Sequence, residues 1–178
     1  VASPLPLDPA PALGTGATFT TETRLNGVQQ IVVDFNRDVS DVYLPAGTVA
    51  ISCPPTPGSC DMTVTSHALI NGGQSLQIDV AGGTNGYCYA IDISGVLTAG
   101  AIAVGQEPNL DCVVQLLEGD VNGSGTVNTI DMAFIKTKVG QQVLPDNVRF
   151  DVNCSGTINT IDMAATKTKI GVVTATCE

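Results

Sequence analysis

The chain has 178 residues, of which 43% are hydrophobic and 13% charged, and its net charge is −10. This composition excludes an intrinsically disordered chain of low hydrophobicity and high charge, and no apolar run reaches the roughly 18 residues that a membrane-spanning helix needs. No basic stripe is available to neutralise phosphates, which argues against nucleic acid as a partner.

Residues 1–16 contain four prolines and no basic residue. They predict an extended arm and differ from a secretory signal peptide, which begins with positive charge. We expect a signal peptide upstream of this arm to have been removed. Two interpretations of the arm remain open: a solvated tail, or an arm that lies on a sheet of its own chain or of a neighbour.

Apolar and polar residues alternate between residues 17 and 118, and turns rich in Gly and Asn separate the alternating segments. The pattern is typical of an antiparallel β-sandwich. The expected strands cover residues 18–25, 30–35, 48–53, 62–68, 75–80, 87–93 and 112–117. Segments 31–39, 75–80 and 87–96 resemble a bacterial Ig-like domain, which implies the same fold for residues 17–118 and no particular activity.

This first domain shows no convincing catalytic grouping. Asp38 and Asp41 could serve a glycosidase, but the chain has no tryptophan and only three tyrosines and four phenylalanines with which to build a sugar cleft. A Ser/His/Asp set and a glycine-rich phosphate loop are also missing. We therefore expect a protein without enzymatic activity.

Six cysteines, an even number, predict disulfide bonds and hence a secreted or cell-surface protein. Zinc is the competing interpretation, but no Cys-x-x-Cys pair or Cys/His cluster occurs. His67, the single histidine, is expected at the surface. The expected disulfide pairs are Cys53–Cys60, Cys88–Cys112 and Cys154–Cys177.

A 21-residue unit that begins at Asp120 returns at Asp151 with 16 identical positions. Each copy carries oxygen-bearing side chains at positions 1, 3, 5, 9 and 12 and a glycine at position 6. This is the spacing of a calcium loop, in which a hard cation collects oxygens from one tight turn. A single copy could be an ordinary Asx-rich turn, but two copies in one register favour calcium. The expected ligands, with a backbone carbonyl at position 7, are Asp120, Asn122, Ser124, Thr126, Asn128, Asp131, Asp151, Asn153, Ser155, Thr157, Asn159 and Asp162.

Each loop is followed by Met-Ala-x-x-Lys-Thr-Lys-x-Gly, which predicts a short helix with lysines in its last turn and a terminating glycine. A loop followed by a helix, twice, with Asp at position 12, resembles the dockerin module of extracellular proteins over residues 119 to about 172. The resemblance implies a small all-α module at residues 119–178, with two EF-hand-like loops and two bound Ca²⁺ ions. It also implies docking on a cohesin, which is a β-sandwich partner.

In dockerins, loop positions 10 and 11 and helix positions 17 and 18 contact the partner. Because the two copies carry the same residues at these positions, either copy could dock. The Lys-Thr pair at positions 17 and 18 departs from the family's frequent Lys-Arg pair. The resemblance thus assigns partner binding to Thr129, Ile130, Lys136, Thr137, Thr160, Ile161, Lys167 and Thr168.

Charge is unevenly distributed, since residues 1–118 carry 11 acidic and two basic residues and residues 119–178 carry six acidic and five basic. The leading hypothesis is a secreted assembly protein whose calcium-loaded module docks on a separate cohesin-like sandwich or on the sandwich of another copy. Docking between copies would build an extracellular filament or surface layer. The alternative hypothesis is a polysaccharide-binding or accessory module that its dockerin anchors to a cohesin scaffold.

Overall fold

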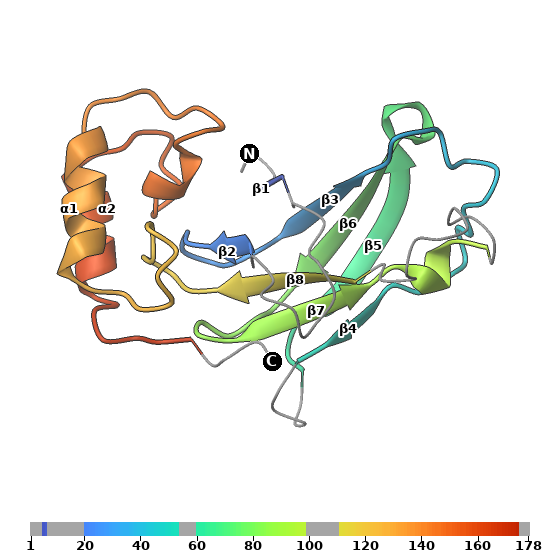
Figure 1. Cartoon of the computed structure of the whole chain (residues 1–178), viewed down its shortest axis with the longest axis horizontal. Helices are drawn as coiled ribbons and strands as arrows, with labels where there is room; N and C mark the ends of the chain where they lie inside the picture. Colours follow the sequence, from blue (N-terminus) through green and yellow to red (C-terminus); the bar gives the residue numbers. More distant parts are fainter. Residues whose placement is uncertain (1–4, 7–19, 54–59, 99–110, 175–178) are drawn as a thin grey trace.

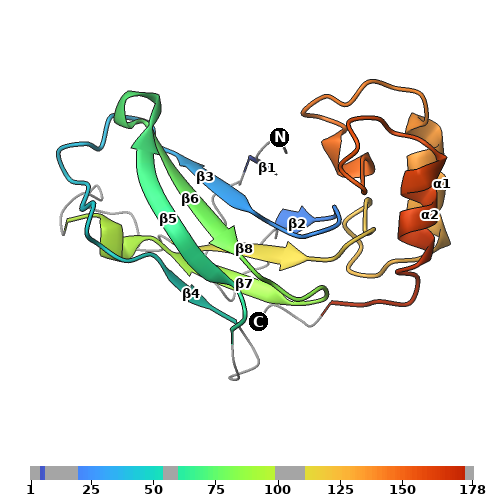
Figure 2. The same ribbon diagram turned by 180° about the vertical axis from the view of Figure 1, so that it is seen from behind.

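A computed structural model describes residues 5–6, 20–53, 60–98 and 111–174 of the chain. Its N-terminal part consists of two four-stranded sheets, and two helices lie side by side at the opposite end of the molecule (Figure 1). The segments that lead into the helices lie between the helices and the sheets, as the view from behind also shows (Figure 2).

Apart from the short strand at residues 5–6, the strands of both sheets are those that the alternation predicted. The first sheet has the order β1 (Leu5–Pro6), β3 (Gln30–Asp34), β6 (Ser75–Ala81), β5 (Thr63–Ile70). The second sheet has the order β2 (Thr20–Glu22), β8 (Asp111–Leu116), β7 (Cys88–Asp92), β4 (Ala50–Ser52). Each of the seven predicted strands overlaps one of β2 to β8, so the prediction of a mainly β N-terminal part is confirmed.

The prediction of a purely antiparallel domain is wrong in two places. β1 pairs with β3 in parallel, with Leu5 opposite Ile31, and β2 pairs with β8 in parallel, with Thr21 opposite Gln115. Parallel neighbours cannot be joined by a tight turn and need a long connection, and nearly the whole N-terminal part separates β2 from β8. The pairing of β1 also shows that residues 5–6 of the arm lie on a sheet of their own chain.

The hydrophobic core of this part lies between the two sheets. Ile31, Leu76 and Ile78 of the first sheet and Tyr89 and Ile91 of the second belong to one cluster, and each is at most 2% exposed. In the sequence these residues occupy alternate positions of their strands. Because successive side chains of a strand point to opposite faces, the alternation selects the residues that face the core.

The sequence predicted His67 as an ordinary surface residue, but in the structure it is half-buried and hydrogen-bonded. Its side chain is half-buried, with Nε2 3.0 Å from the carbonyl oxygen of Gly47 and Nδ1 2.9 Å from the hydroxyl oxygen of Tyr43. A carbonyl can only accept, so Nε2 carries the proton and Nδ1 accepts from the tyrosine. The imidazole thereby ties β5 to the loop that precedes β4.

The two predicted helices are confirmed as α1 (Thr129–Lys138) and α2 (Thr160–Lys167). Three short 3₁₀ helices complete the fold: η1 (Asn71–Gly73), η2 (Ser94–Val96) and η3 (Val148–Phe150). The helices have a core of their own, which consists of Val121, Ile135, Phe150, Val152 and Ile158. Among the described residues, no helix has the length and apolar character to cross a membrane.

One of the three predicted disulfides is present, because Cys53 and Cys60 are bonded. Cys154 is a free thiol, so the predicted bond between Cys154 and Cys177 is not formed; Cys177 itself lies outside the described residues. Cys88 is disulfide-bonded, but the register of β7 and β8 places Ile91 opposite Cys112.

The strand register also excludes the predicted bond between Cys88 and Cys112. Cys88 is three residues from Ile91, so about 10 Å of strand separates Cys88 from the position opposite Cys112. A disulfide requires Cα atoms within about 7 Å. The sequence does not contain the register, so it could not reject this pair among the fifteen that six cysteines allow.

Peptide mapping of the unreduced protein should therefore return Cys53 joined to Cys60. It should also return Cys88 joined to Cys177, because the register rejects Cys112 and the other cysteines are bonded or free. Cys154 should react with iodoacetamide in the native protein, since it is exposed and unpaired. Protein reduced before alkylation is the control, and a peptide joining Cys88 to Cys112 would contradict the register.

Candidate functional site

The two loops of the repeat, residues 120–131 and 151–162, fold around the carboxylate at position 1. Asp120 accepts hydrogen bonds from the backbone amides of Ser124, at 2.9 Å, and Gly125, at 2.8 Å. Asp151 accepts the same two bonds in the second loop, at 2.9 and 2.8 Å. One carboxylate thus gathers the amides of positions 5 and 6 and closes the turn.

The turn requires glycine at position 6. Gly125 has a φ of 77° and Gly156 a φ of 83°. Residues with a side chain seldom adopt this left-handed conformation, whereas glycine does so at little cost. The glycine that the sequence pattern singled out therefore has a direct backbone role in both loops.

The carboxylate at position 12 closes each loop and starts the helix. Asp131 accepts from the amides of Asn122, at 3.3 Å, and Asn128, at 2.8 Å. The side chain of Asn128 in turn accepts from the amide of Ile130 at 2.7 Å, which completes a capping box. Asp162 and Asn159 form the same arrangement at α2.

Hydroxyl, carboxylate and backbone carbonyl oxygens lie close together within each loop. Ser124 Oγ lies 3.4 Å from a carboxylate oxygen of Asp120 and 3.0 Å from the carbonyl oxygen of Thr126. The equivalent distances from Ser155 Oγ are 3.4 and 3.1 Å. Oxygens that share a calcium ion are separated by similar distances, since each lies about 2.3–2.6 Å from the metal.

Negative charge is buried in both loops, and no positively charged side chain of the described residues pairs with it. The carboxylates at positions 1 and 12 belong to residues that are at most 4% exposed, and none of them forms an ion pair with another described residue. Burial, and to a lesser degree the charge of Asp120, raises the pKa of Asp131. Buried carboxylates of this kind are costly unless a cation compensates them.

The donor set suits a hard divalent cation. The described residues contain no cluster of three or more His, Cys, Asp or Glu side chains, because Asn, Ser and backbone carbonyls accompany the two aspartates of each loop. Oxygen donors alone favour calcium or magnesium over zinc. The twelve residues that the sequence predicted as ligands therefore lie in two loops whose chemistry fits calcium.

The comparison with protein families identifies the C-terminal part. Residues 118–171 match the model of the dockerin type I domain. This segment is a dockerin type I domain. Dockerins are docking modules without catalytic activity that bind calcium and cohesins. The chain has no match among curated proteins or among solved structures, so the Ig-like resemblance of the N-terminal sheets stays a prediction.

The residues that the sequence assigned to partner binding lie mostly on open helix surface. Ile130 is 55% exposed and Ile161 61%, so more than half of each apolar residue is accessible to a partner. Lys136 and Lys167 are exposed and form no ion pair with another described residue. The hydroxyls of Thr137 and Thr168 donate to carbonyls of their own helices, at 2.6 and 2.7 Å.

The other two lysines of the dockerin domain are engaged within the chain. The ammonium group of Lys138 lies 5.8 Å from the centre of the Phe150 ring, and Lys169 forms an ion pair with Glu118. Only Lys136 and Lys167, which occupy the same position in the two copies, are therefore available to a partner. The repeated sequence, which places two lysines in each helical segment, could not make this distinction.

Sequence reasoning missed Phe134, which is 45% exposed on α1 next to Ile130 along the same face. The second copy has Ala165 at this position, and that side chain packs against the core of the dockerin domain. The two helix faces are thus less alike than the repeat suggested. The signal that could have revealed the difference was the mismatch itself, because it replaces a large apolar residue by a small one.

Removal of divalent cations should destabilise the dockerin domain, because its four buried carboxylates would lose their compensating charge. A calcium concentration about 100 times Kd contributes roughly 2.7 kcal/mol per site. Thermal unfolding followed by circular dichroism should show a clearly lower melting temperature in EDTA than in calcium. Magnesium is the control and should stabilise less, because it demands stricter octahedral geometry. Equal melting in calcium and in EDTA would contradict the electrostatic argument.

Proposed function

We propose that this protein is a secreted, non-catalytic assembly protein whose dockerin domain, with two Ca²⁺ ions bound, docks on a cohesin-like β-sandwich partner. The observation that carries the proposal is the pairing of two features in each copy. A loop that buries two uncompensated carboxylates is followed by a helix with an exposed isoleucine and a free lysine. In this proposal the buried carboxylates of the loop require a cation, and the helix provides the contact surface.

Each loop would hold one ion through the same set of oxygens. The side chains at positions 1, 3, 5 and 12 and the carbonyl at position 7 are the direct ligands. The side-chain oxygens of Asn128 and Asn159, at position 9, already accept a helix amide, and we assign them a contact through water, as is common at this position. The ion supplies the positive charge that the buried aspartates lack.

The proposed contact surface combines apolar area with positive charge. Burial of Ile130 or Ile161 would contribute about 1.5–3 kcal/mol, and Lys136 or Lys167 would orient an acidic partner and make association sensitive to salt. Thr129, Thr137 and their counterparts Thr160 and Thr168 flank these residues. Phe134 adds an aromatic side chain to the α1 face only.

The partner could be a separate cohesin-like domain or another copy of this chain. Charge supports the second version, since residues 1–118 carry 11 acidic and only two basic residues, and Asp34, Asp38, Asp41 and Asp61 are exposed. A contact between the helices of one copy and the sheets of the next is heterologous and would grow into a filament or layer. A separate cohesin, or a polysaccharide bound by the sheets, would leave the purified chain monomeric.

Calcium ligation is tested by the double variant Asp120→Ala, Asp151→Ala. It removes the carboxylate that organises each loop, so isothermal titration calorimetry should detect no calcium binding. The matched control is Asp146→Ala, an exposed acidic residue between the two copies, which should bind two ions like the unmodified chain. If the unmodified chain binds no calcium, the proposed function fails.

Docking between copies is tested by light scattering after size-exclusion chromatography, in calcium and in EDTA. We expect large species in calcium only. A variant with Lys136→Glu, Lys167→Glu, Ile130→Asp and Ile161→Asp should remain monomeric without loss of calcium binding. The α1 changes alone should weaken association more than the α2 changes, because Phe134 accompanies α1.

A monomer under all conditions would reject docking between copies and favour a separate cohesin or a polysaccharide. Unchanged assembly of the fourfold variant would show that the helices are not the contact surface.

A further inference from the structure

A short segment of the N-terminal part, residues 22–26, runs between the two calcium loops; we call it the linking segment. On the side of the first loop, the carbonyl of Thr23 accepts from the amide of Gly119 at 2.8 Å. The amide of Asn26 donates to the carboxylate of Glu118 at 3.1 Å. Both contacts involve residues that precede the first loop, which begins at Asp120.

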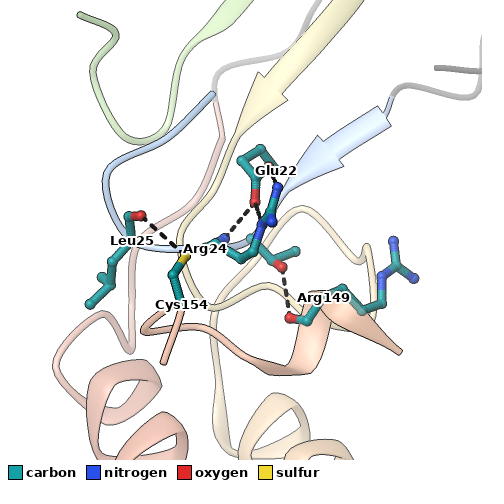
Figure 3. A network of polar contacts seen from close by, with 6 residues as sticks. Glu22, Arg24, Leu25, Arg149 and Cys154 are labelled. Atoms are coloured by element: carbon teal, nitrogen blue, oxygen red, sulfur yellow. Dashed lines mark hydrogen bonds and ion pairs between the residues drawn. The ribbon is translucent and has the colours of Figure 1, made fainter. Parts of the chain in front are cut away.

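On the side of the second loop, the linking segment contacts the loop itself. The amide of Leu25 donates to the carbonyl of Val152, position 2 of the loop, at 2.7 Å. The hydroxyl of Thr23 donates to the carbonyl of Arg149 at 2.8 Å (Figure 3). The Leu25 side chain also packs against the core cluster that contains Val152. The second loop is therefore held by the sheets through both polar and apolar contacts.

The linking segment also contains a buried ion pair, between Glu22 and Arg24. Glu22, 1% exposed, accepts from the backbone amide and the Nε of Arg24, each at 2.8 Å, and from its Nη2 at 2.7 Å (Figure 3). The hydrogen bond to Glu22 raises the pKa of Arg24, and the charge of Asp151 acts more weakly in the same direction. Glu22 thus holds the guanidinium of Arg24 between Thr23 and Leu25, the two residues that contact the second copy.

The two copies differ at position 4, where only the second copy approaches the linking segment. Gly123, in the first loop, has no atom within 4 Å of where a Cβ would lie. Cys154, in the second loop, keeps a φ of 56°, which is strained for a residue with a side chain. Its sulfur lies 3.9 Å from the carbonyl oxygen of Leu25 (Figure 3). The departure from the repeat therefore coincides with the contact to the sheets.

We infer that the linking segment is the outer support of the second calcium loop, with Thr23, Leu25 and the Glu22–Arg24 pair as positioning residues. The inference rests on the proposed calcium binding. Because coupling between two binding events is reciprocal, calcium in the second loop and attachment of the dockerin domain to the sheets stabilise each other. Within the described part of the chain, no backbone hydrogen bond from the sheets reaches the twelve residues of the first loop, which pairs instead with the C-terminal residues 172–174. The two sites therefore differ in calcium affinity.

The decisive comparison uses Thr23→Val and Thr21→Val. Both residues are buried threonines of similar surroundings, but Thr21 donates to Gln115 within its own sheet, at 3.0 Å, whereas Thr23 donates to Arg149 beside the second loop. Each variant is combined with Asp120→Ala, which leaves only the second site, and with Asp151→Ala, which leaves only the first.

Calorimetric titration with calcium should show that Thr23→Val weakens the second site about fivefold, the equivalent of one hydrogen bond. Thr21→Val should change either site less than twofold, and neither variant should alter the first site. Glu22→Gln removes one charge of the buried pair that holds Arg24 in the linking segment and should weaken the second site more than tenfold.

Hydrogen exchange supplies a readout independent of affinity. The Leu25 amide should exchange at least tenfold more slowly in calcium than in EDTA, and this protection should vanish in Asp151→Ala but persist in Asp120→Ala. Equal effects of Thr23→Val and Thr21→Val, or protection of Leu25 that does not depend on Asp151, would overturn the inference. Absence of calcium binding in the unmodified chain would instead refute the proposed function.

Discussion

Uncompensated negative charge is the constraint on which the C-terminal third of the molecule depends. Two aspartates per loop are buried, and each uses both carboxylate oxygens to gather backbone amides of its own loop. These hydrogen bonds fix the turn and bring serine, carboxylate and carbonyl oxygens close together. The same arrangement concentrates charge that a folded protein seldom tolerates without a partner. A loop with its oxygens already positioned therefore gains stability from a cation and loses little entropy in binding it.

The loops fix the residue at which each helix begins. The carboxylate at position 12 closes the loop and also completes the capping box of the helix, so the first turn of each helix is fixed by a residue of the calcium site. The apolar residues Val121, Val152 and Ile158 lie inside the loops and reach the core together with Ile135 of α1. With their inner faces used in this way, α1 and α2 present Ile130 and Ile161 outward. In the proposed function, calcium binding in the loops therefore supports the helices that present the proposed contact surface.

Local patterns predicted most of this structure, and contacts distant in sequence account for the rest. Alternation located β2 to β8, and ligand spacing located both loops and both helices, because each of these signals lies within about twenty residues. The parallel pairing of β2 with β8 and the register that separates Cys88 from Cys112 depend on segments that meet only in the folded chain. The linking segment escaped notice for the same reason, since the hydroxyl of Thr23 contacts Arg149, 126 residues further along. His67 and Phe134 were misjudged or missed because burial, and not residue type, decides their role.

Two of the five positions at which the two copies differ, positions 4 and 15, have unequal surroundings. Position 4 is glycine where the first loop is open and cysteine where the second meets the linking segment. Position 15 is an exposed phenylalanine on α1 and an alanine packed into the core on α2, and position 16 changes from Ile135 to Thr166, both fully buried. The remaining two positions exchange valine for isoleucine. The predicted ligands and the residues that the sequence assigned to partner binding are of the same types in both copies, whereas Phe134 adds to the proposed contact surface of α1 only. A duplicated unit attached to one sheet domain cannot keep two equivalent environments. Positions 4 and 15 differ where the linking segment or the core of the dockerin domain meets one copy and not the other.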